Sequence, residues 1–185
     1  ETSWAWAKIC FVETGVAGLS IEDATGRADA PIYPFELAVE RVRAAVAAAR
    51  SLPFPFTLTA RAENFLLGRP DLDDTIRRLQ AFQEAGADVL YAPGLTRREQ
   101  IAAVVSSVDR PVNVIMGLAG LDLTVADLQA LGVKRISVGS AFARAALGAF
   151  LRAAREVKEQ GTFGFSRDTI AFKDINQRFE RSAGG

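Results

Sequence analysis

The chain contains no histidine and only one cysteine, Cys10, among its 185 residues. Histidine is the commonest general base and the commonest zinc ligand. Its absence excludes a Ser-His-Asp triad, a Cys-His pair and a histidine-rich metal site within this chain. A single cysteine cannot form an internal disulfide, which fits a reducing compartment. We interpret Cys10 as a buried, inert thiol.

The sequence also lacks net charge and long apolar runs. It has 22 basic and 22 acidic residues without a block of like charge, so neither nucleic acid nor an anionic membrane is indicated as a partner. No apolar run reaches the roughly 18 residues of a membrane-spanning helix. Residues 4–12 are apolar but short and lack the flanks of a signal peptide, so we interpret them as the end of a helix. We therefore expect a cytoplasmic protein.

Short apolar strands followed by amphipathic helices recur five times along the chain. The expected strands cover residues 19–23, 56–61, 88–93, 112–116 and 135–139. Strands that alternate with helices form a parallel sheet, because each crossover helix returns the chain to the same edge. A closed (β/α)8 barrel needs eight such units and about 250 residues. The sequence therefore predicts an incomplete α/β fold of the TIM-barrel type, in which the first three strands are absent.

Apolar residues at spacings of three and four predict the helices between these strands. We expect helices over residues 36–50, 75–85, 96–108 and 124–131, a long one after residue 140, and a last one over 166–179. Caps are expected from Asp71 or Asp73, Thr96, Thr124, Ser140 and Ser166, and left-handed helix ends at Gly86 and Gly132. We predict a partial barrel over residues 1–165 and a C-terminal helix and tail over 166–185, with 181–185 disordered.

The strands place polar side chains on one face. Side chains alternate along a strand, so apolar residues on the helix-covered face leave polar residues on the other. The inward residues are Ser20, Glu22, Thr57, Thr59, Arg61, Glu63, Asn113 and Ser137. Strands buried on both faces are usually apolar throughout. A polar inner face over four strands indicates a barrel with a pocket for a charged ligand.

Two carboxylates, Glu22 and Asp23, stand at the end of the first strand. Mg²⁺ usually takes one or two carboxylates together with water and substrate oxygens, so this pair is a candidate magnesium site. The alternative is structural. Asp23 would then cap the next turn, and Glu22 would pair with a basic neighbour.

Arg61 and Glu63 stand at the end of the second strand. The guanidinium fork binds two oxygens at once, which suits a substrate carboxylate or phosphate. Arg61 is therefore our first candidate for substrate binding and catalysis, and Glu63 is a further catalytic candidate. The alternative is an internal salt bridge from Arg61 to Glu22 or Glu63. Such a pair could also open when substrate binds.

Two weaker candidates for substrate binding are Asn113 and Ser140. Asn113 could donate a hydrogen bond to a substrate carboxylate, or it could bond to a neighbouring strand. Gly139 and Ser140 open a helix, whose N-terminal N–H groups favour an anion. Ser140 could equally be a plain helix cap.

Four segments resemble, in their order and spacing, the isocitrate lyase/phosphoenolpyruvate mutase superfamily. They are GVAGLSIED at 15–23, TARAENF at 59–65, GADVLY at 86–91 and RISVGS at 135–140. More narrowly, they look like the phosphonomutase-like bacterial branch. The resemblance implies a (β/α)8 barrel, dependence on Mg²⁺, and small α-keto or hydroxy carboxylates as substrates. It also implies cleavage or formation of a C–C or P–C bond through an enolate-like intermediate.

The resemblance further implies roles for single residues. Glu22 matches a carboxylate near the metal, Arg61 matches the arginine that holds the substrate carboxylate, and Glu63 matches the acidic residue that follows it. Many members exchange C-terminal helices between subunits, so the chain is expected to form a homo-oligomer through residues 166–179.

Three departures from the family pattern narrow the activity. The main metal carboxylates belong to strands that this chain lacks. The lyase loop Lys-Lys-Cys-Gly-His is replaced at residues 24–31 by ATGRADAP, which has no cysteine, lysine or histidine. The expected strand over residues 88–93 leads into YAPG at 91–94, without the glutamate of the lyases or the histidine of the mutase. These changes disfavour isocitrate and methylisocitrate. Oxaloacetate decarboxylation, phosphonopyruvate hydrolysis and dimethylmalate-type cleavage remain open.

Three hypotheses follow. The preferred one is an enzyme in which Mg²⁺ polarises a keto acid and Arg61 holds its carboxylate. The second is a truncated, inactive family member that only self-associates, because five strands leave two open sheet edges. The third is a small open-sheet module that binds an anion at Gly139 and Ser140.

Overall fold

The computed structural model describes residues 15–117 and 120–180. The predictions for residues 4–12, for Cys10 and for residues 181–185 lie outside these ranges. The sheet is built from β1 (Gly18–Glu22), β2 (Thr57–Arg61), β3 (Val89–Tyr91), β4 (Val112–Ile115) and β5 (Arg135–Ser137). The helices are α2 (Phe35–Arg50), α3 (Leu72–Glu84), α4 (Arg98–Ser106), α5 (Val125–Ala130), α6 (Ala141–Gln160) and α7 (Phe172–Glu180), with a short 3₁₀ helix η1 (Gly164–Asp168).

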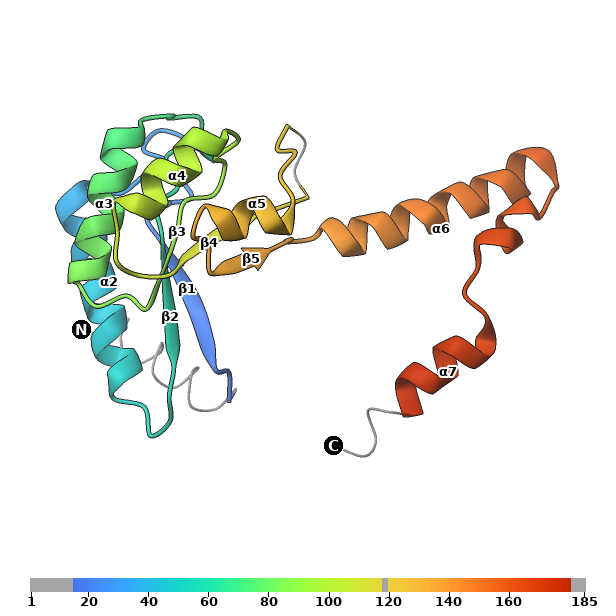
Figure 1. The fold of residues 1–185 in the computed structure, drawn as a ribbon, viewed down its shortest axis with the longest axis horizontal. Coiled ribbons are helices and arrows are strands. Elements are labelled where there is room, and N and C mark those ends of the chain that lie inside the picture. Colours follow the sequence, from blue (N-terminus) through green and yellow to red (C-terminus); the bar gives the residue numbers. More distant parts are fainter. Residues whose placement is uncertain (1–14, 118–119, 181–185) are drawn as a thin grey trace. The chain divides into compact units, whose positions relative to one another are not determined.

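All five strands pair in parallel, in the order β1-β2-β3-β4-β5 (Figure 1). A helix connects each strand to the next, as the alternating pattern predicts. The structure therefore confirms a five-stranded parallel α/β fold of the partial TIM-barrel type. None of the described helices has the length and hydropathy to cross a bilayer.

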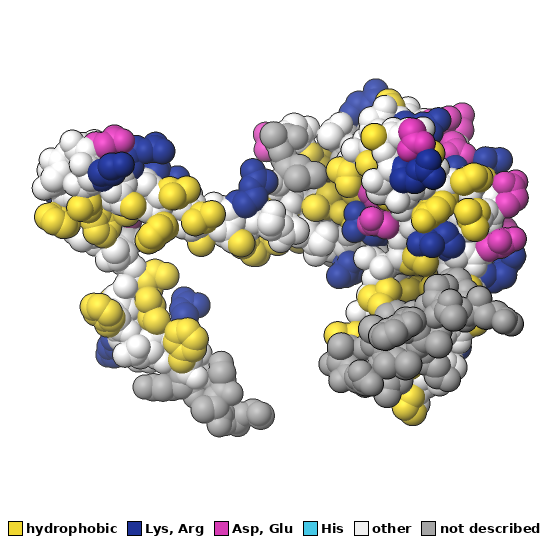
Figure 2. All heavy atoms as spheres, turned by 180° about the vertical axis from the view of Figure 1, so that it is seen from behind, with side chains coloured by type: hydrophobic (Ala, Val, Ile, Leu, Met, Phe, Trp, Pro, Cys, Tyr) yellow, Lys and Arg dark blue, Asp and Glu magenta, His cyan; other side chains and the backbone are white. Residues whose placement is uncertain are grey.

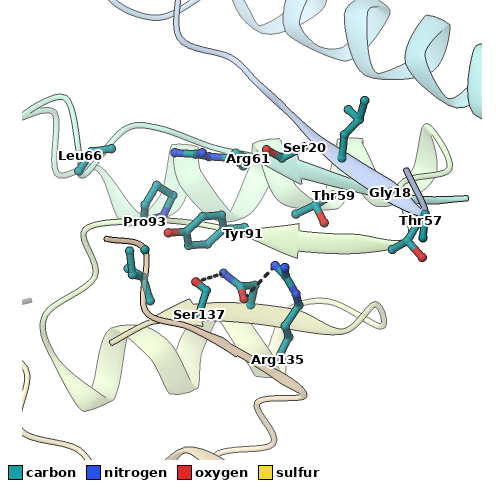
Figure 3. Close-up of a pocket in the computed structure, with 15 residues that line it drawn as sticks. Gly18, Ser20, Thr57, Thr59, Arg61, Leu66, Tyr91, Pro93, Arg135 and Ser137 are labelled. Carbon is teal, nitrogen blue, oxygen red and sulfur yellow. Dashed lines mark hydrogen bonds between the residues drawn. The ribbon is translucent and has the colours of Figure 1, made fainter. Parts of the chain in front are cut away.

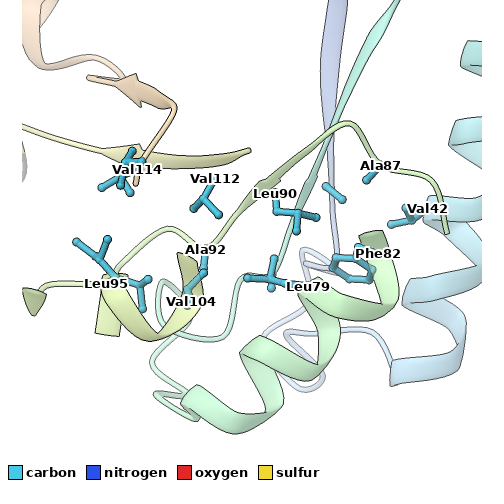
Figure 4. Close-up of a cluster of buried hydrophobic side chains, with 14 of the residues drawn as sticks. Val42, Leu79, Phe82, Ala87, Leu90, Ala92, Leu95, Val104, Val112 and Val114 are labelled. Carbon is cyan, nitrogen blue, oxygen red and sulfur yellow. The ribbon is translucent and has the colours of Figure 1, made fainter. Parts of the chain in front are cut away.

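The core lies between the sheet and the helices α2 to α4. Figure 4 shows Leu79 and Phe82 of α3 beside Leu90 of β3, and all three side chains are fully buried. Leu58 and Ala60 of β2 are also buried, whereas Thr59 between them faces the other side of the sheet and lines the pocket there. Burial of one large apolar side chain contributes about 1.5–3 kcal/mol, so this layer fixes the sheet on which the polar face is built.

Most of the predicted helix ends are confirmed. The Asp71 carboxylate accepts a hydrogen bond from the Asp74 N–H, and Thr124 and Asp127 cap α5 reciprocally. Gly86 and Gly132 have φ of +104° and +85°, the left-handed conformation expected after a helix. The prediction for Thr96 is wrong, because α4 begins two residues later. There the Gln100 side chain accepts a hydrogen bond from the Arg97 N–H.

The chain divides into two compact units after Gly139. The long helix α6 thus groups with the tail, which differs from the predicted boundary at residue 165. The last helix begins at Phe172, and Ser166 lies in η1 instead of capping it. The reason is Glu156, whose carboxylate accepts hydrogen bonds from Thr162, Gly164 and Phe165 and so holds the chain reversal after α6.

The second unit exposes many large apolar side chains. No residue of α6 is buried, and Figure 2 shows apolar side chains in yellow along α6 and α7. More than half of the side-chain surface is exposed at Phe142, Leu147, Phe150, Leu151, Phe163, Ile170, Phe172 and Phe179. A soluble protein rarely leaves such a contiguous apolar surface without a partner.

Candidate active site

The sheet face opposite the helices carries a pocket of about 730 Å³ (Figure 3). Its lining includes Ser20, Thr57, Thr59, Arg61, Tyr91, Asn113, Arg135 and Ser137. These residues alternate with the apolar core residues along their strands. The predicted polar inner face is therefore present in the structure.

One residue from each strand lines up in a row across the sheet. The strand register pairs Glu22 with Arg61, Arg61 with Tyr91, Tyr91 with Asn113, and Asn113 with Arg135. Neighbouring parallel strands are about 4.8 Å apart, so these side chains are close enough to interact in sequence. Figure 3 shows Arg61 and Arg135 on either side of Tyr91.

Arg61 is held by both of the carboxylates that its sequence position suggests. Its Nε lies 2.6 Å from a Glu63 oxygen, and its Nη1 lies 3.3 Å from a Glu22 oxygen. Its guanidinium carbon lies 5.0 Å from the centre of the Tyr91 ring. Arginine has five N–H donors, so these two contacts leave donors for a ligand in the pocket. The arrangement is a fixed cation at the end of a strand.

Glu63 is almost completely buried, with 2% of its surface exposed. Burial raises the pKa of its carboxyl, while the hydrogen bond and charge of Arg61 act in the opposite direction. Its carboxylate does not line the pocket, and one oxygen accepts the Arg61 Nε hydrogen. This position suits a residue that orients Arg61. A catalytic role for Glu63 stays a prediction.

Asp23 points away from Glu22, into the layer beneath the strand end. One oxygen accepts the Glu63 N–H at 2.8 Å, and the other accepts from Arg78 at 3.1 Å. Arg78 also donates to Asp74 at 2.7 Å. Sequence reasoning missed Arg78, because α3 lies far along the chain from β1. The predicted role of Asp23 as a metal ligand is not favoured by these contacts.

Glu22 is the described residue best placed to reach a cation. Its carboxylate is about half exposed, and a single oxygen contacts Arg61. In residues 15–117 and 120–180, no three His, Cys, Asp or Glu side chains form a group that could hold a metal ion. Glu22 therefore fits one position in the coordination shell of Mg²⁺, whose remaining ligands would be substrate and water.

Asn113 bonds to the neighbouring strand and also lines the pocket. Its amide nitrogen donates to the Ser137 hydroxyl at 3.0 Å, and its oxygen accepts from Arg135 at 3.2 Å. The alternative for Asn113, a hydrogen bond to a neighbouring strand, is thus found in the structure. A contact between Asn113 and substrate stays a prediction. Sequence reasoning missed Tyr91 and Arg135 as site residues. Both residues can be identified from the strand register, which places them in the same row as Arg61 and Asn113.

Ser140 is the first residue of the second unit. It occupies the N-cap position of α6, and its carbonyl oxygen accepts from the Arg144 N–H. Its side chain makes no capping hydrogen bond. Its role in substrate binding stays a prediction.

The five parallel strands, the helices between them and the polar sheet face define the class as an α/β protein of the partial TIM-barrel type. Residues 9–158 match the family model described as phosphoenolpyruvate phosphomutase. The chain belongs to the phosphoenolpyruvate mutase/isocitrate lyase superfamily, whose members include lyases and mutases. The predicted family resemblance is confirmed.

Several relatives match over most of the chain. It is 34% identical over 118 residues to an oxaloacetate decarboxylase of Bradyrhizobium diazoefficiens, which covers 61% of this chain and 39% of the relative. A solved structure from Burkholderia cenocepacia J2315 is 62% identical with a TM-score of 0.89, over 93% of this chain and 62% of that one. A phosphonopyruvate hydrolase in complex with oxalate and Mg²⁺ is 26% identical with a TM-score of 0.76, over 96% and 64%. The chain thus spans less than two thirds of each of these proteins.

Proposed function

We propose that this chain carries the carboxylate-binding part of an enzyme that cleaves a C–C or P–C bond in a small α-keto or hydroxy acid. The observation that supports this proposal is Arg61, a pocket-facing cation fixed by Glu22 and Glu63. A fixed fork binds a carboxylate in one orientation, which places the bond to be broken at a defined position.

The pocket suits a reaction in which negative charge develops on the substrate. Cleavage next to a keto group leaves an electron pair that delocalises as an enolate. Arg61 and the hydroxyl and amide groups of the row are preorganised donors for that charge. Mg²⁺, with Glu22 as one ligand, would polarise the keto oxygen when bound. The phosphonopyruvate hydrolase that binds oxalate, an enolate mimic, together with Mg²⁺ supports this choice.

Oxaloacetate is the substrate to test first, because the decarboxylase relative is 34% identical over 118 residues. We expect the purified protein with Mg²⁺ to form pyruvate from oxaloacetate, followed by ¹H NMR, and to be inhibited competitively by oxalate. Phosphonopyruvate and 2,3-dimethylmalate are the comparison substrates. Heat-unfolded protein is the control for decarboxylation by the metal ion alone. A folded sample that neither turns over these acids nor binds oxalate at millimolar concentration would favour the inactive alternative.

We also propose that the apolar surface of the second unit binds another copy of the chain. Phe142 and Phe150 are two turns apart on α6 and more than 60% exposed. Their burial in a subunit interface would remove apolar area from water, at about 25 cal/mol per Å². Light scattering is expected to show an oligomer for the unaltered chain.

The double substitution Phe142→Asp, Phe150→Asp is expected to lower the mass of this oligomer, because it places two carboxylates in the interface. Arg144→Asp, which lies on the opposite side of α6 at 100° per residue, is the control and should leave the mass unchanged. An unchanged mass for the double variant would show that another surface joins the subunits.

A further inference from the structure

Three pocket residues form a chain of hydrogen bonds that starts at a permanent cation, and a fourth, Tyr91, stands next to Asn113 in the strand register. Arg135 donates to the Asn113 oxygen, and the Asn113 amide donates to the Ser137 oxygen (Figure 3). The Ser137 hydroxyl also acts on Tyr91, whose pKa it lowers. The chain therefore runs from β5 to β4 and back to β5, in the lining of the pocket that it shares with Tyr91 of β3.

The direction of this chain follows from the donors available. Arginine has only donors, so its contact fixes the Asn113 oxygen as the acceptor and turns the amide NH₂ toward Ser137. Ser137 accepts there, and its single hydrogen is then free to be donated to the Tyr91 oxygen. A Tyr91 oxygen that accepts this hydrogen keeps its own hydroxyl hydrogen for a ligand. Bonds aligned in one direction polarise each other and hold the last hydroxyl in place.

Tyr91 is also the pocket residue that can exchange a proton. Among the described residues that line the pocket, the titratable side chains are Arg61, Tyr91 and Arg135. The two arginines remain cations at all relevant pH values. Burial raises the pKa of Tyr91, so its hydroxyl is protonated in the resting site. The charge of Arg61 and the bond from Ser137 act in the opposite direction and stabilise the tyrosinate that a proton transfer would create.

We propose that Tyr91 is the acid that protonates the enolate carbon, with Ser137, Asn113 and Arg135 as its positioning residues. The inference rests on the proposed function. In decarboxylation of oxaloacetate, the bond between C3 and the terminal carboxylate breaks, CO₂ leaves, and the electron pair remains as the enolate of pyruvate. C3 then forms a bond to the Tyr91 hydrogen, which gives the methyl group of pyruvate. The tyrosinate regains its proton from water.

Exchange of the pyruvate methyl hydrogens in D₂O tests this step, because it is the same proton transfer in both directions. We expect the full protein with Mg²⁺ to catalyse the exchange, followed by ¹H NMR. Tyr91→Phe should slow it by about 10²-fold or more, the usual contribution of a general acid, and change the Kd of oxalate less than about threefold. Tyr33→Phe is the matched control, because Tyr33 is the other tyrosine of the sequence and does not line this pocket.

Ser137→Ala tests the positioning role separately. Ser137 lowers the pKa of Tyr91, so loss of its hydroxyl should raise that pKa and move the alkaline limb of the exchange rate to higher pH, a shift that a purely structural defect would not produce.

The outcomes distinguish the two proposals. If the wild type catalyses exchange and Tyr91→Phe does so at the same rate, the role of Tyr91 is overturned and the proposed function is kept. Loss of oxalate binding in Tyr91→Phe would also overturn it, because the hydroxyl would then serve binding. No exchange by a folded wild type that still forms pyruvate from oxaloacetate would overturn the role of Tyr91 alone. A folded wild type that neither turns over the acids nor binds oxalate would overturn the proposed function, and the role of Tyr91 with it.

Discussion

Arg61→Lys is expected to weaken oxalate binding by about 10²-fold while the protein stays folded. Lysine keeps the positive charge but loses the planar fork, so it cannot hold a ligand carboxylate through two parallel bonds. The loss corresponds to about 3 kcal/mol, within the range for removing a charged hydrogen-bonding partner. Isothermal titration of oxalate in the presence of Mg²⁺ measures it directly.

The choice of lysine avoids a defect in folding. Arg61→Ala would leave Glu63 buried without its cation, and a lower affinity could then reflect a disturbed strand end. Arg98→Ala is the matched control, since Arg98 forms an exposed pair with Asp127 and does not line the pocket. Equal affinity for wild type and Arg61→Lys would show that the fork does not hold the ligand.

Arg78→Met is expected to lower the free energy of unfolding by about 3–5 kcal/mol. Methionine fills the space of the aliphatic stem but removes the cation between two carboxylates, Asp23 and Asp74. The side chain of Asp23 is only 1% exposed, so its charge would remain in the interior. The Glu63 N–H would still donate to it, but no cation would balance the charge. Urea unfolding followed by circular dichroism measures the change.

Arg77→Met is the matched control for this prediction. Arg77 is the next residue along α3 and also pairs with Asp74, but it is 61% exposed. An exposed pair contributes at most about 1 kcal/mol. Similar losses for the two variants would show that burial of the Arg78 pair does not matter for stability.

The cost of Arg78→Met should shrink in acid. Burial alone would raise the pKa of Asp74, but hydrogen bonds from Arg78, Asn64 and Arg77 lower it to about 2. A carboxyl whose pKa is lowered by folding stabilises the fold at any pH above 3.8, its pKa in the unfolded chain. This contribution is lost as the pH falls toward 2, its pKa in the folded protein. Burial raises the pKa of Asp23, so protonation removes its buried charge early in the same titration. Unfolding at pH 7 and near pH 3 should therefore show a smaller difference between variant and wild type at the lower pH.

The local alternation of side chains explains why the pocket face could be predicted. Leu58 and Ala60 are buried and Thr59 and Arg61 line the pocket, as a two-residue period requires. Helix ends at Gly86 and Thr124 follow from equally local rules, since a left-handed turn and a capping hydroxyl need only neighbours in sequence. Such features are fixed within a few residues.

The pairing of charges could not be predicted in the same way. Glu22 and Asp23 are adjacent, yet Glu22 contacts Arg61 and Asp23 contacts Arg78, which is 55 residues further along the chain. Successive side chains of a strand point to opposite faces, so each carboxylate meets the cation that its own face presents. That choice depends on the packing of α3 against the sheet.

The sequence by itself therefore determined the parallel α/β fold, the polar inner face and the candidate role of Arg61. Only the tertiary structure decided the row from Glu22 to Arg135, the direction of the hydrogen bonds from Arg135 to Ser137, and the burial of Asp23 against Arg78. The physical reason is the distance along the chain over which each kind of interaction acts. Periodicity, caps and turns act over a few residues, whereas strand register and ion pairing join residues that become neighbours only when the sheet and its helices have packed.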